Sequence, residues 1–132
     1  MPQISKAIIN QNNEFLLQLR DDHPGISYPN QWSFFGGEIE KGESPWQALQ
    51  RDIMDELSWH PDRGRYLYQW DNFDHPGYSL YFFALDFVGR REKLVLKEGQ
   101  DLKWFTLEDV MLETKIAPHV LMHIYRFLHL SS

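Results

Sequence analysis

The stretch from Gly37 to Trp59, GEIEKGESPWQALQRDIMDELSW, constrains the fold of this chain more strongly than any other. Its second half carries bulky apolar residues at intervals of three and four positions, which predicts a helix with a single apolar stripe. The residues of this stripe are Trp46, Leu49, Ile53 and Leu57. The pattern therefore favours a helix that buries one face against a core.

Capping residues mark the start of this helix. Ser44 is a good N-cap, and Pro45 suits the first helical position. Gln47, three residues after Ser44, completes a capping box. The segment before Ser44 begins with a glycine turn and is rich in glutamate, so we expect a loop over residues 37–43 that leads into the helix.

Three acidic residues, Asp52, Asp55 and Glu56, fall on one side of the predicted helix. At about 100° per residue, this side borders the apolar stripe, so the acids gather beside the core. Clustered carboxylates repel one another unless a cation lies among them. Because the chain contains no cysteine, the expected ligands are oxygens, which suit Mg²⁺ or Mn²⁺ rather than zinc or copper.

The same stretch resembles the signature of the MutT-like Nudix hydrolase family. That signature reads Gly, five residues, Glu, seven residues, then R-E-U-x-E-E-x-G-U, where U is a bulky apolar residue. The matching residues are Gly37, Glu43, Arg51, Ile53, Glu56 and Trp59. Asp52 and Asp55 stand where the family usually has Glu, and Ser58 stands where it usually has Gly. The preceding run WSFFGG resembles the strand that leads into the signature.

The resemblance implies an α+β fold, a Nudix-type α/β/α sandwich. A mixed β-sheet would lie between the loop–helix–loop of the signature and a C-terminal helix, in one domain over residues 1–132. It also implies a metal-dependent pyrophosphohydrolase that cleaves a nucleoside diphosphate linked to another moiety, by attack of water on a phosphorus. The small size favours a nucleoside triphosphate or a nucleotide-sugar. The alternative is a nucleotide-binding sensor with this fold and weak or no catalysis, motivated by Asp52, Asp55 and Ser58.

Family roles for the metal site carry over residue by residue. Asp52, Asp55 and Glu56 would be metal ligands, and the backbone carbonyl of Gly37, or of its neighbour Gly36, would add a further oxygen. These two glycines would also contact the substrate.

The resemblance leaves the general base open. Glu98, in a loop ahead of the strand with Trp104, would bring an acid from outside the helix as a ligand or as the general base. Asp52 and Glu98 are rival assignments for the base, and Asp101 is a weaker third.

Two arginines also receive roles from the resemblance. Arg51 would orient the acids, most simply by pairing with Glu43; the alternative is an ordinary helix-surface ion pair with Asp55, four residues on. Arg20, at the end of a predicted strand, would contact phosphate, and the alternative is an ordinary surface residue. Ser58 would need a positive φ if the turn after the helix is as tight as in the family, at a cost of about 1 kcal/mol.

Aromatic residues and histidines complete the list of candidates. Aromatics that could stack on a nucleobase, but that are more often core or dimer contacts, are Tyr28, Trp32, Trp70, Phe73 and Tyr81. His119 and His123 have the spacing of a zinc helix. Because the accompanying acid is missing, we interpret both as surface residues.

Alternating and aromatic-rich runs elsewhere predict strands. The expected strands are 4–9, 14–20, 31–36, 65–73, 78–88, 93–96 and 102–105. We expect a tight turn at Asn12-Asn13, a loop over 21–31 and a hairpin turn over 74–77. Thr106 caps a predicted short helix through Met111. A last helix should run from Ala117, with Pro118 in its first turn, to about residue 130.

Length and charge limit the classes of partner. A chain of 132 residues suits one domain. A net charge of -6 argues against a nucleic-acid partner and against an anionic membrane. No apolar stretch reaches transmembrane length, and no leader segment is evident, so we expect a cytoplasmic protein. The aromatic hairpin makes a homodimer a hypothesis.

Overall fold

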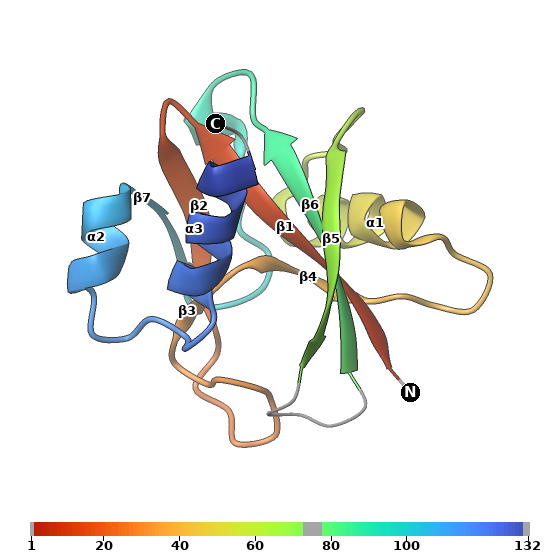
Figure 1. Ribbon diagram of the computed structural model, residues 1–132, viewed down its shortest axis with the longest axis horizontal. Coiled ribbons are helices and arrows are strands. Elements are labelled where there is room, and N and C mark those ends of the chain that lie inside the picture. The colour runs from red at the N-terminus through yellow and green to blue at the C-terminus, as the bar shows by residue number, and fades with distance from the viewer. Residues whose placement is uncertain (1, 73–77, 131–132) are drawn as a thin grey trace.

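The computed structural model describes residues 2–72 and 78–130, and it has one mixed β-sheet with helices on both faces (Figure 1). The strands are β1 (Gln3–Gln11), β2 (Glu14–Leu19), β3 (Trp32–Ser33), β4 (Phe35–Glu38), β5 (Arg65–Asn72), β6 (Tyr78–Asp86) and β7 (Asp101–Phe105). The helices are α1 (Pro45–Leu57), α2 (Leu107–Leu112) and α3 (Val120–Leu130), with a short 3₁₀ turn η1 at Arg91–Lys93. None of the described helices is long and apolar enough to cross a membrane.

Strand β1 lies at the centre of the sheet. It pairs with β6 in parallel along its length, and on its other edge it pairs first with β4 and then with β2, both antiparallel. In this register Lys6 lies opposite Gly36, and Ser5 lies opposite Gly37. The glycine strand of the signature is therefore fixed against the first half of the central strand.

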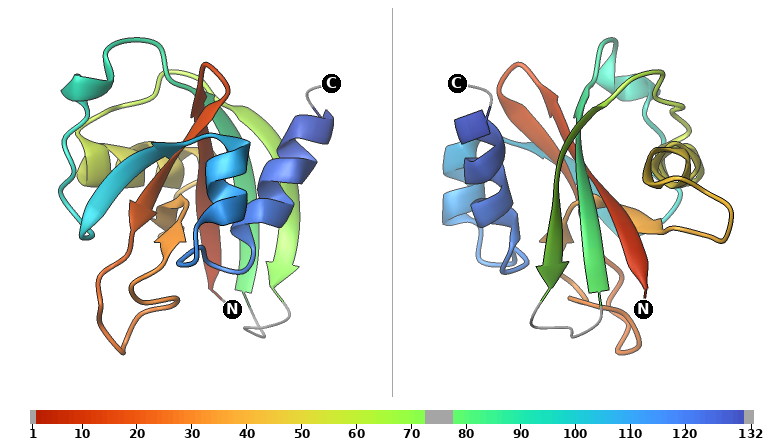
Figure 2. Two further views of the ribbon diagram at one scale, coloured as in Figure 1. Left: turned by 90° about the vertical axis from the view of Figure 1, so that its left-hand side faces the viewer. Right: turned by 45° about the vertical axis from the view of Figure 1, so that its right-hand side comes forward.

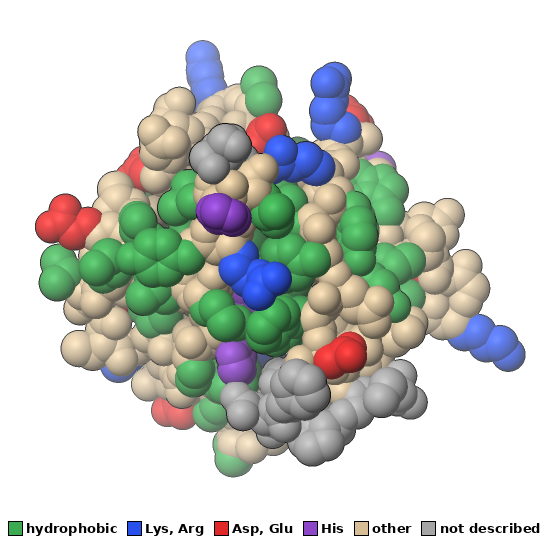
Figure 3. Space-filling view, viewed as in Figure 1, with side chains coloured by type: hydrophobic (Ala, Val, Ile, Leu, Met, Phe, Trp, Pro, Cys, Tyr) green, Lys and Arg blue, Asp and Glu red, His purple; other side chains and the backbone are tan. Residues whose placement is uncertain are grey.

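The two faces of the sheet bury separate cores. Successive residues of β1 point to opposite faces, so Ala7 and Ile9 contact the core under α1, whereas Ile8 contacts the core under α3. Helix α1 covers one face and α2 and α3 cover the other (Figure 2). Hydrophobic side chains dominate the outer surface around α3, with basic and histidine side chains among them (Figure 3). This is the α+β sandwich that the resemblance implied.

Helix α1 begins and ends where the sequence predicted. The Ser44 hydroxyl accepts the Gln47 backbone N–H at 3.1 Å, and the Gln47 side chain accepts the Ser44 N–H at 2.9 Å. Ser58 closes the helix in the left-handed region, at φ 57 and ψ 31, which confirms the expected positive φ. In the predicted stripe Leu49, Ile53 and Leu57 are fully buried, and Trp46 is half-buried beside them.

Two predicted strands differ from the structure. The run 31–36 is not one strand, because the chain bends at Phe34 into β3 and β4. Residues 93–96 are not a strand: η1 is followed by irregular chain whose backbone bonds to the end of α1. Val95 N–H donates to Leu57 O at 3.1 Å, and Lys97 N–H donates to Glu56 O at 2.9 Å.

The last helix starts at Val120, three residues later than predicted. Ala117 N–H donates to Trp32 O at 2.9 Å, and Ile116 forms a parallel bridge with Trp32. This pairing holds the chain extended up to Ala117, so the helix cannot begin there. The predicted turns at Asn12-Asn13 and over 21–31 are present, and the predicted hairpin turn over 74–77 lies outside the described residues.

Candidate active site

Two acids of α1, Asp52 and Glu56, form a buried pair against the glycine strand. They lie one helical turn apart and are 9% and 6% exposed. A Cβ atom on Gly37 would come within 2.9 Å of Asp52 Oδ2, so only glycine leaves room for this carboxylate. The Gly36 N–H donates to the carboxylate of Glu56. Among the described residues, Asp52 Oδ2 and Glu56 Oε2 have no hydrogen-bond partner.

Burial makes the charged form of both acids costly. It raises the pKa of Asp52 to about 6, although the neighbouring Arg51 guanidinium lowers it. Burial also raises the pKa of Glu56, and Asp52 raises it further. A cation bound between the two carboxylates would remove this cost. The electrostatics of the pair therefore suit a metal ion.

Arg51 orients the pair from the loop side. Its guanidinium donates to both carboxylate oxygens of Glu43, at 2.8 and 2.9 Å, and to Asp52 Oδ1 at 3.0 Å. It also donates to the backbone carbonyl of Glu38 at 3.1 Å. The predicted pairing with Glu43 is confirmed, and the hydrogen bonds from Arg51 lower the pKa of Glu43 to about 2. Because Arg51 occupies Oδ1 of Asp52, only Oδ2 is left for a ligand.

Asp55 differs from the expectation that three acids share a face beside the core. Its side chain is exposed, although it lies close enough to Asp52 to raise the pKa of that carboxyl. The buried face of α1 therefore includes Asp52 and Glu56 but not Asp55. Over the described ranges, no three His, Asp or Glu side chains converge closely enough to hold a metal by themselves.

Glu98 reaches the acid pair from a different segment. The backbone bonds of Val95 and Lys97 to the end of α1 hold its loop against the helix. Glu98 lies close enough to Glu56 to raise the pKa of Glu56. Asp101, the weaker candidate, is exposed at the start of β7, where its side chain accepts the Leu102 N–H at 2.8 Å. The structure thus brings Glu98 to the pair and leaves Asp101 at the surface.

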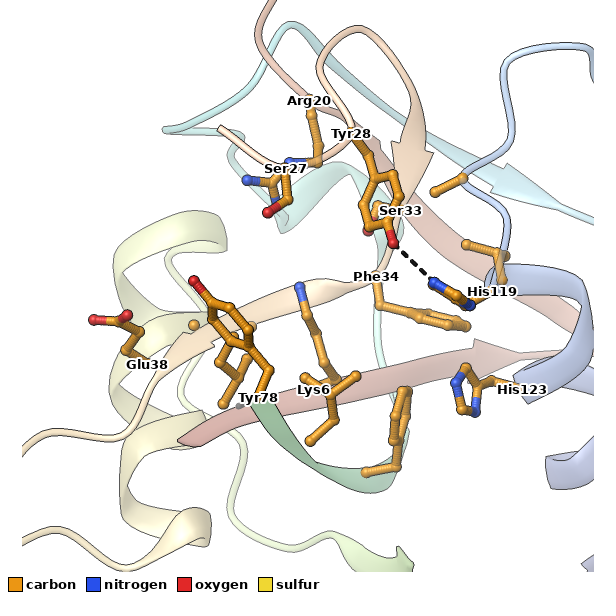
Figure 4. A pocket seen from close by; sticks show the side chains of 17 residues that line it. Lys6, Arg20, Ser27, Tyr28, Ser33, Phe34, Glu38, Tyr78, His119 and His123 are labelled. Atoms are coloured by element: carbon orange, nitrogen blue, oxygen red, sulfur yellow. Dashed lines mark hydrogen bonds between the residues drawn. The ribbon is translucent and has the colours of Figure 1, made fainter. Parts of the chain in front are cut away.

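A cleft of about 240 Å³ lies on the other side of the glycine strand. It is lined by Gly36, Gly37 and Glu38 near α1, and by residues of β1, β6 and α3 further along. Figure 4 shows the Lys6 side chain in the middle of this cleft, with Arg20 and Ser27 at one side. The Arg20 Nε is buried and has no hydrogen-bond partner within the part of the chain that the structure describes.

Lys6 is a residue that sequence reasoning missed. Its pKa is lowered first by burial and then by Arg20, whereas Glu56 and Asp52 raise it. Lys6 is therefore close to a second cation and to the acid pair, and an anionic ligand beside Lys6 and Arg20 would stabilise the charge of both. A signal was available: Lys6 alternates with Ile4 and Ile8, so it points inward along the predicted strand.

The end of the cleft under α3 is aromatic. The Tyr28 hydroxyl and His119 Nε2 lie 2.8 Å apart in a hydrogen bond (Figure 4). The interpretation of His123 as a surface residue is wrong: it is 1% exposed. Its spacing could have shown this, because His123 lies three residues after Val120 and four before Phe127, both buried in the same core. His119 is half-buried and lines the cleft.

The other aromatic candidates lie mostly in the core. Tyr28 lines the cleft, whereas Trp32 is buried against Phe105 at a centroid distance of 5.0 Å. Trp70 and Tyr81 pack partly buried against the two cores, one on each. Phe73 lies outside the described residues.

Comparison with known proteins agrees with this geometry. A sequence model of the NUDIX domain matches residues 2–124. Nucleoside triphosphatase NudI from Enterobacter sp. (strain 638) is 29% identical in an alignment of 114 positions that covers 78% of this chain and 80% of that protein. The solution structure of the E. coli ORF135 protein superposes with a TM-score of 0.78 at 27% identity, covering 100% of this chain and 91% of that one.

A MutT protein from Methanosarcina mazei Go1 has a TM-score of 0.83 at 19% identity, covering 99% of this chain and 95% of that chain, and it supports the fold alone. The domain match, by contrast, extends over most of the sequence and includes the loop, helix and acids of the signature. In the structure these same residues form the glycine strand, the Arg51–Glu43 pair and the buried acids. The chain therefore belongs to the Nudix family and is a MutT-like Nudix hydrolase.

Proposed function

We propose that this hydrolase cleaves a phosphoric anhydride bond of a nucleoside triphosphate, using Mg²⁺ or Mn²⁺ held at Asp52 and Glu56. Water would add to a phosphorus while the bond from that phosphorus to the bridging oxygen breaks, and the proton of the water would pass to a carboxylate. The observation that carries the proposal is the pair of buried carboxylate oxygens left without partners beside the glycine strand. The name of the relative NudI supports the substrate class.

The donor set fits a hard divalent cation, and members of the Nudix family generally use such ions. Mg²⁺ commonly takes one or two carboxylates and fills its remaining positions with water and substrate phosphates. Asp52 Oδ2 and Glu56 Oε2 are the primary ligands in this proposal, and Glu98 and the Gly37 carbonyl would complete them. When bound, the ion would polarise the phosphoryl oxygens and orient the attacking water. Asp55 is exposed, so it would reach the ion only from the solvent side of the site.

The residues of the chain supply the rest of the chemistry. Lys6 and Arg20 would neutralise phosphate oxygens in the cleft. Both cations line the cleft, and the positive charge of each makes the charged form of the other less favourable. Arg51 would hold Asp52 in place rather than touch substrate, since its donors already serve Glu43, Asp52 and Glu38. Glu98 and Asp52 stay rival general bases. The loop position of Glu98 beside Glu56 supports the former, whereas Asp52 would serve as the base only with an Oδ2 that is not a metal ligand.

The test is a release assay for phosphate and pyrophosphate with nucleoside triphosphates, nucleotide-sugars, ADP-ribose and NADH. It would be run with Mg²⁺, with Mn²⁺ and with a chelator. We expect metal-dependent turnover of a triphosphate that falls at least about a thousandfold in Glu56→Gln. Glu108→Gln, which alters an exposed acid on α2, is the matched control and should leave turnover unchanged.

Two results would overturn this proposal. Turnover that survives both chelator and Glu56→Gln would remove the metal and the acid pair from the mechanism. Nucleotide binding without turnover on any substrate would favour the sensor, and the shorter Asp52 and Asp55 would then be the first residues to change to Glu.

A further inference from the structure

We propose that His123 donates a hydrogen bond to a carbonyl oxygen of the nucleobase, and that Tyr68 and Arg126 hold it in the tautomer that donates. The inference rests on the proposed function, because that function places a nucleotide in the cleft. It adds the residue that reads the base and the kind of base that this residue selects.

The cleft has two chemically different ends. The end beside α1 is polar and carries the glycine strand, with Lys6 and Arg20 next to it, so phosphate groups belong there. The end under α3 is lined by apolar and aromatic side chains, namely Phe34, Leu80, Phe82, Ala117 and Val120. A nucleobase is flat and apolar on its faces, so it suits the second end. His123 lines the cleft at this end (Figure 4).

The imidazole of His123 is rigidly held. It stacks on the Phe82 ring at a centroid distance of 4.1 Å and an interplanar angle of 25°. Its Nδ1 lies 2.7 Å from the Tyr68 hydroxyl. Its Nε2 is buried and, counting only partners among the described residues, makes no hydrogen bond. A buried polar atom without a partner is uncommon in a folded protein and marks a place for a ligand group.

The neighbours of Tyr68 decide which nitrogen carries the proton. The Arg126 guanidinium lies over the Tyr68 ring, with its central carbon 4.9 Å from the ring centre, and its positive charge acts on the Tyr68 hydroxyl. The positive charge of Arg126 favours the orientation in which the hydroxyl oxygen faces the guanidinium and the hydroxyl proton points to His123 Nδ1. Burial lowers the pKa of His123 to about 3, so the ring is neutral and holds one proton. That proton is then on Nε2.

An Nε2–H donor discriminates between a base with a carbonyl and a base with an amino group at the same exocyclic position. A carbonyl oxygen at that place accepts the hydrogen bond, whereas an amino group presents a second donor and leaves both unsatisfied. Two pairs of nucleotides contain this difference, UTP against CTP and ITP against ATP, and in each pair the ring nitrogen next to the carbonyl also carries a proton that the amino member lacks. The carbonyl member of at least one pair should be preferred about tenfold or more in kcat/KM.

The experiment compares these ratios in the wild-type enzyme, His123→Phe, Tyr68→Phe and Tyr66→Phe. His123→Phe keeps an aromatic ring on Phe82 and removes the donor, so the preference should fall to about one. Tyr68→Phe removes only the hydroxyl that fixes the tautomer, so the preference should fall at least about threefold. Tyr66→Phe removes an exposed hydroxyl from the same strand and should leave the ratio unchanged. A role of His123 in packing alone would not move the ratio.

A parallel binding measurement separates this inference from the proposed function. Dissociation constants for the same four nucleotides would be measured by calorimetry with Mg²⁺, using the wild-type chain and His123→Phe. A carbonyl preference in binding that His123→Phe abolishes supports the inference even where no nucleotide is hydrolysed. Turnover with equal rates within both pairs, or a preference that survives His123→Phe, would overturn it while the hydrolase stands. A wild-type chain that binds none of the four would overturn both.

Discussion

Lys6 is a cation at a strand position where apolar residues would be expected. It alternates with Ile4 and Ile8 along β1, and its side chain enters the cleft instead of the core. Burial and Arg20 both oppose its charge, as the lowered pKa shows. A bound anion would offset the cost of this charge, so we expect Lys6 to contact the substrate.

The substitution Lys6→Met tests this at the residue scale. Methionine keeps the length of the side chain and removes the charge, so a phosphate oxygen loses a charged hydrogen bond. We expect kcat/KM for the triphosphate to fall by about tenfold to a hundredfold, mostly through KM. Steady-state kinetics would measure it, with Lys115→Met as an exposed control. An unchanged KM would exclude Lys6 from substrate binding.

Glu56 illustrates the cost of holding a charge for a ligand. Its folded-state pKa is raised, so its contribution to stability is present below the unfolded pKa and is lost as the pH rises through the folded pKa. In the presence of chelator, Glu56→Gln should therefore raise the free energy of unfolding at pH 8 by about 1–3 kcal/mol. The difference should vanish near pH 4. Urea titrations at the two pH values would measure it, and a less stable variant at pH 8 would contradict the argument.

Among the elements, helix α1 shows how much local sequence can predict. Its stripe and its capping box are encoded within a few residues of one another, and both are present, whereas the left-handed Ser58 was suggested only by the glycine that the family usually has there. The Arg51–Glu43 pair is also present, and it was predicted from the family resemblance. Asp55 was placed too close to the core, because spacing gives the direction of a side chain but not where the neighbouring sheet ends.

Substitutions at the two ends of α1 should change the free energy of unfolding in opposite directions. Ser58 adopts φ 57, a region that costs a residue with a Cβ about 1 kcal/mol. Ser58→Gly should therefore raise the free energy of unfolding by about 0.5–1 kcal/mol. Ser44→Ala removes the hydroxyl that accepts the Gln47 N–H and should lower it by about 1 kcal/mol. Denaturant unfolding of both variants would check the pair, and a destabilised Ser58→Gly would mean that serine makes a contact there that outweighs its strain.

Elements that depend on distant partners were predicted less well. The start of α3 is delayed because Ala117 bonds to Trp32, and residues 93–96 follow α1 rather than a strand because Val95 bonds to Leu57. In both cases the decisive partner is far away in the sequence, so no local pattern contains it. Glu98 could be proposed only through the family resemblance, since its loop reaches Glu56 by the same contacts with α1.

At the scale of the whole molecule, the site lies where the sheet meets the helices that cover its two faces. The acids belong to α1 and Lys6 to β1, whereas the aromatic end of the cleft combines Phe82 of β6 with His123 of α3. His123 lies on the buried side of α3 and contacts Tyr68, over whose ring Arg126 lies. Because its ring is part of the core, its protonation acts on the stability of the entire fold and not only on the cleft.

The pH dependence of unfolding should show this. The His123 pKa is about 3 in the folded chain against 6.5 for an ordinary histidine, so between these values the unfolded chain binds the extra proton. The stability associated with the neutral ring is therefore present above pH 6.5 and is lost as the pH falls toward 3. Asp52 and Glu56 act in the opposite sense, because their raised pKa values favour the folded state on acidification.

Both carboxyls are also present in His123→Phe, so their effect cancels when the free energy of unfolding of that variant is subtracted from that of the wild type. Relative to His123→Phe, the free energy of unfolding of the wild type should fall by about 2 kcal/mol between pH 7.5 and pH 5. Urea midpoints at the two pH values would measure it, and parallel curves would mean that the folded chain admits a charged His123.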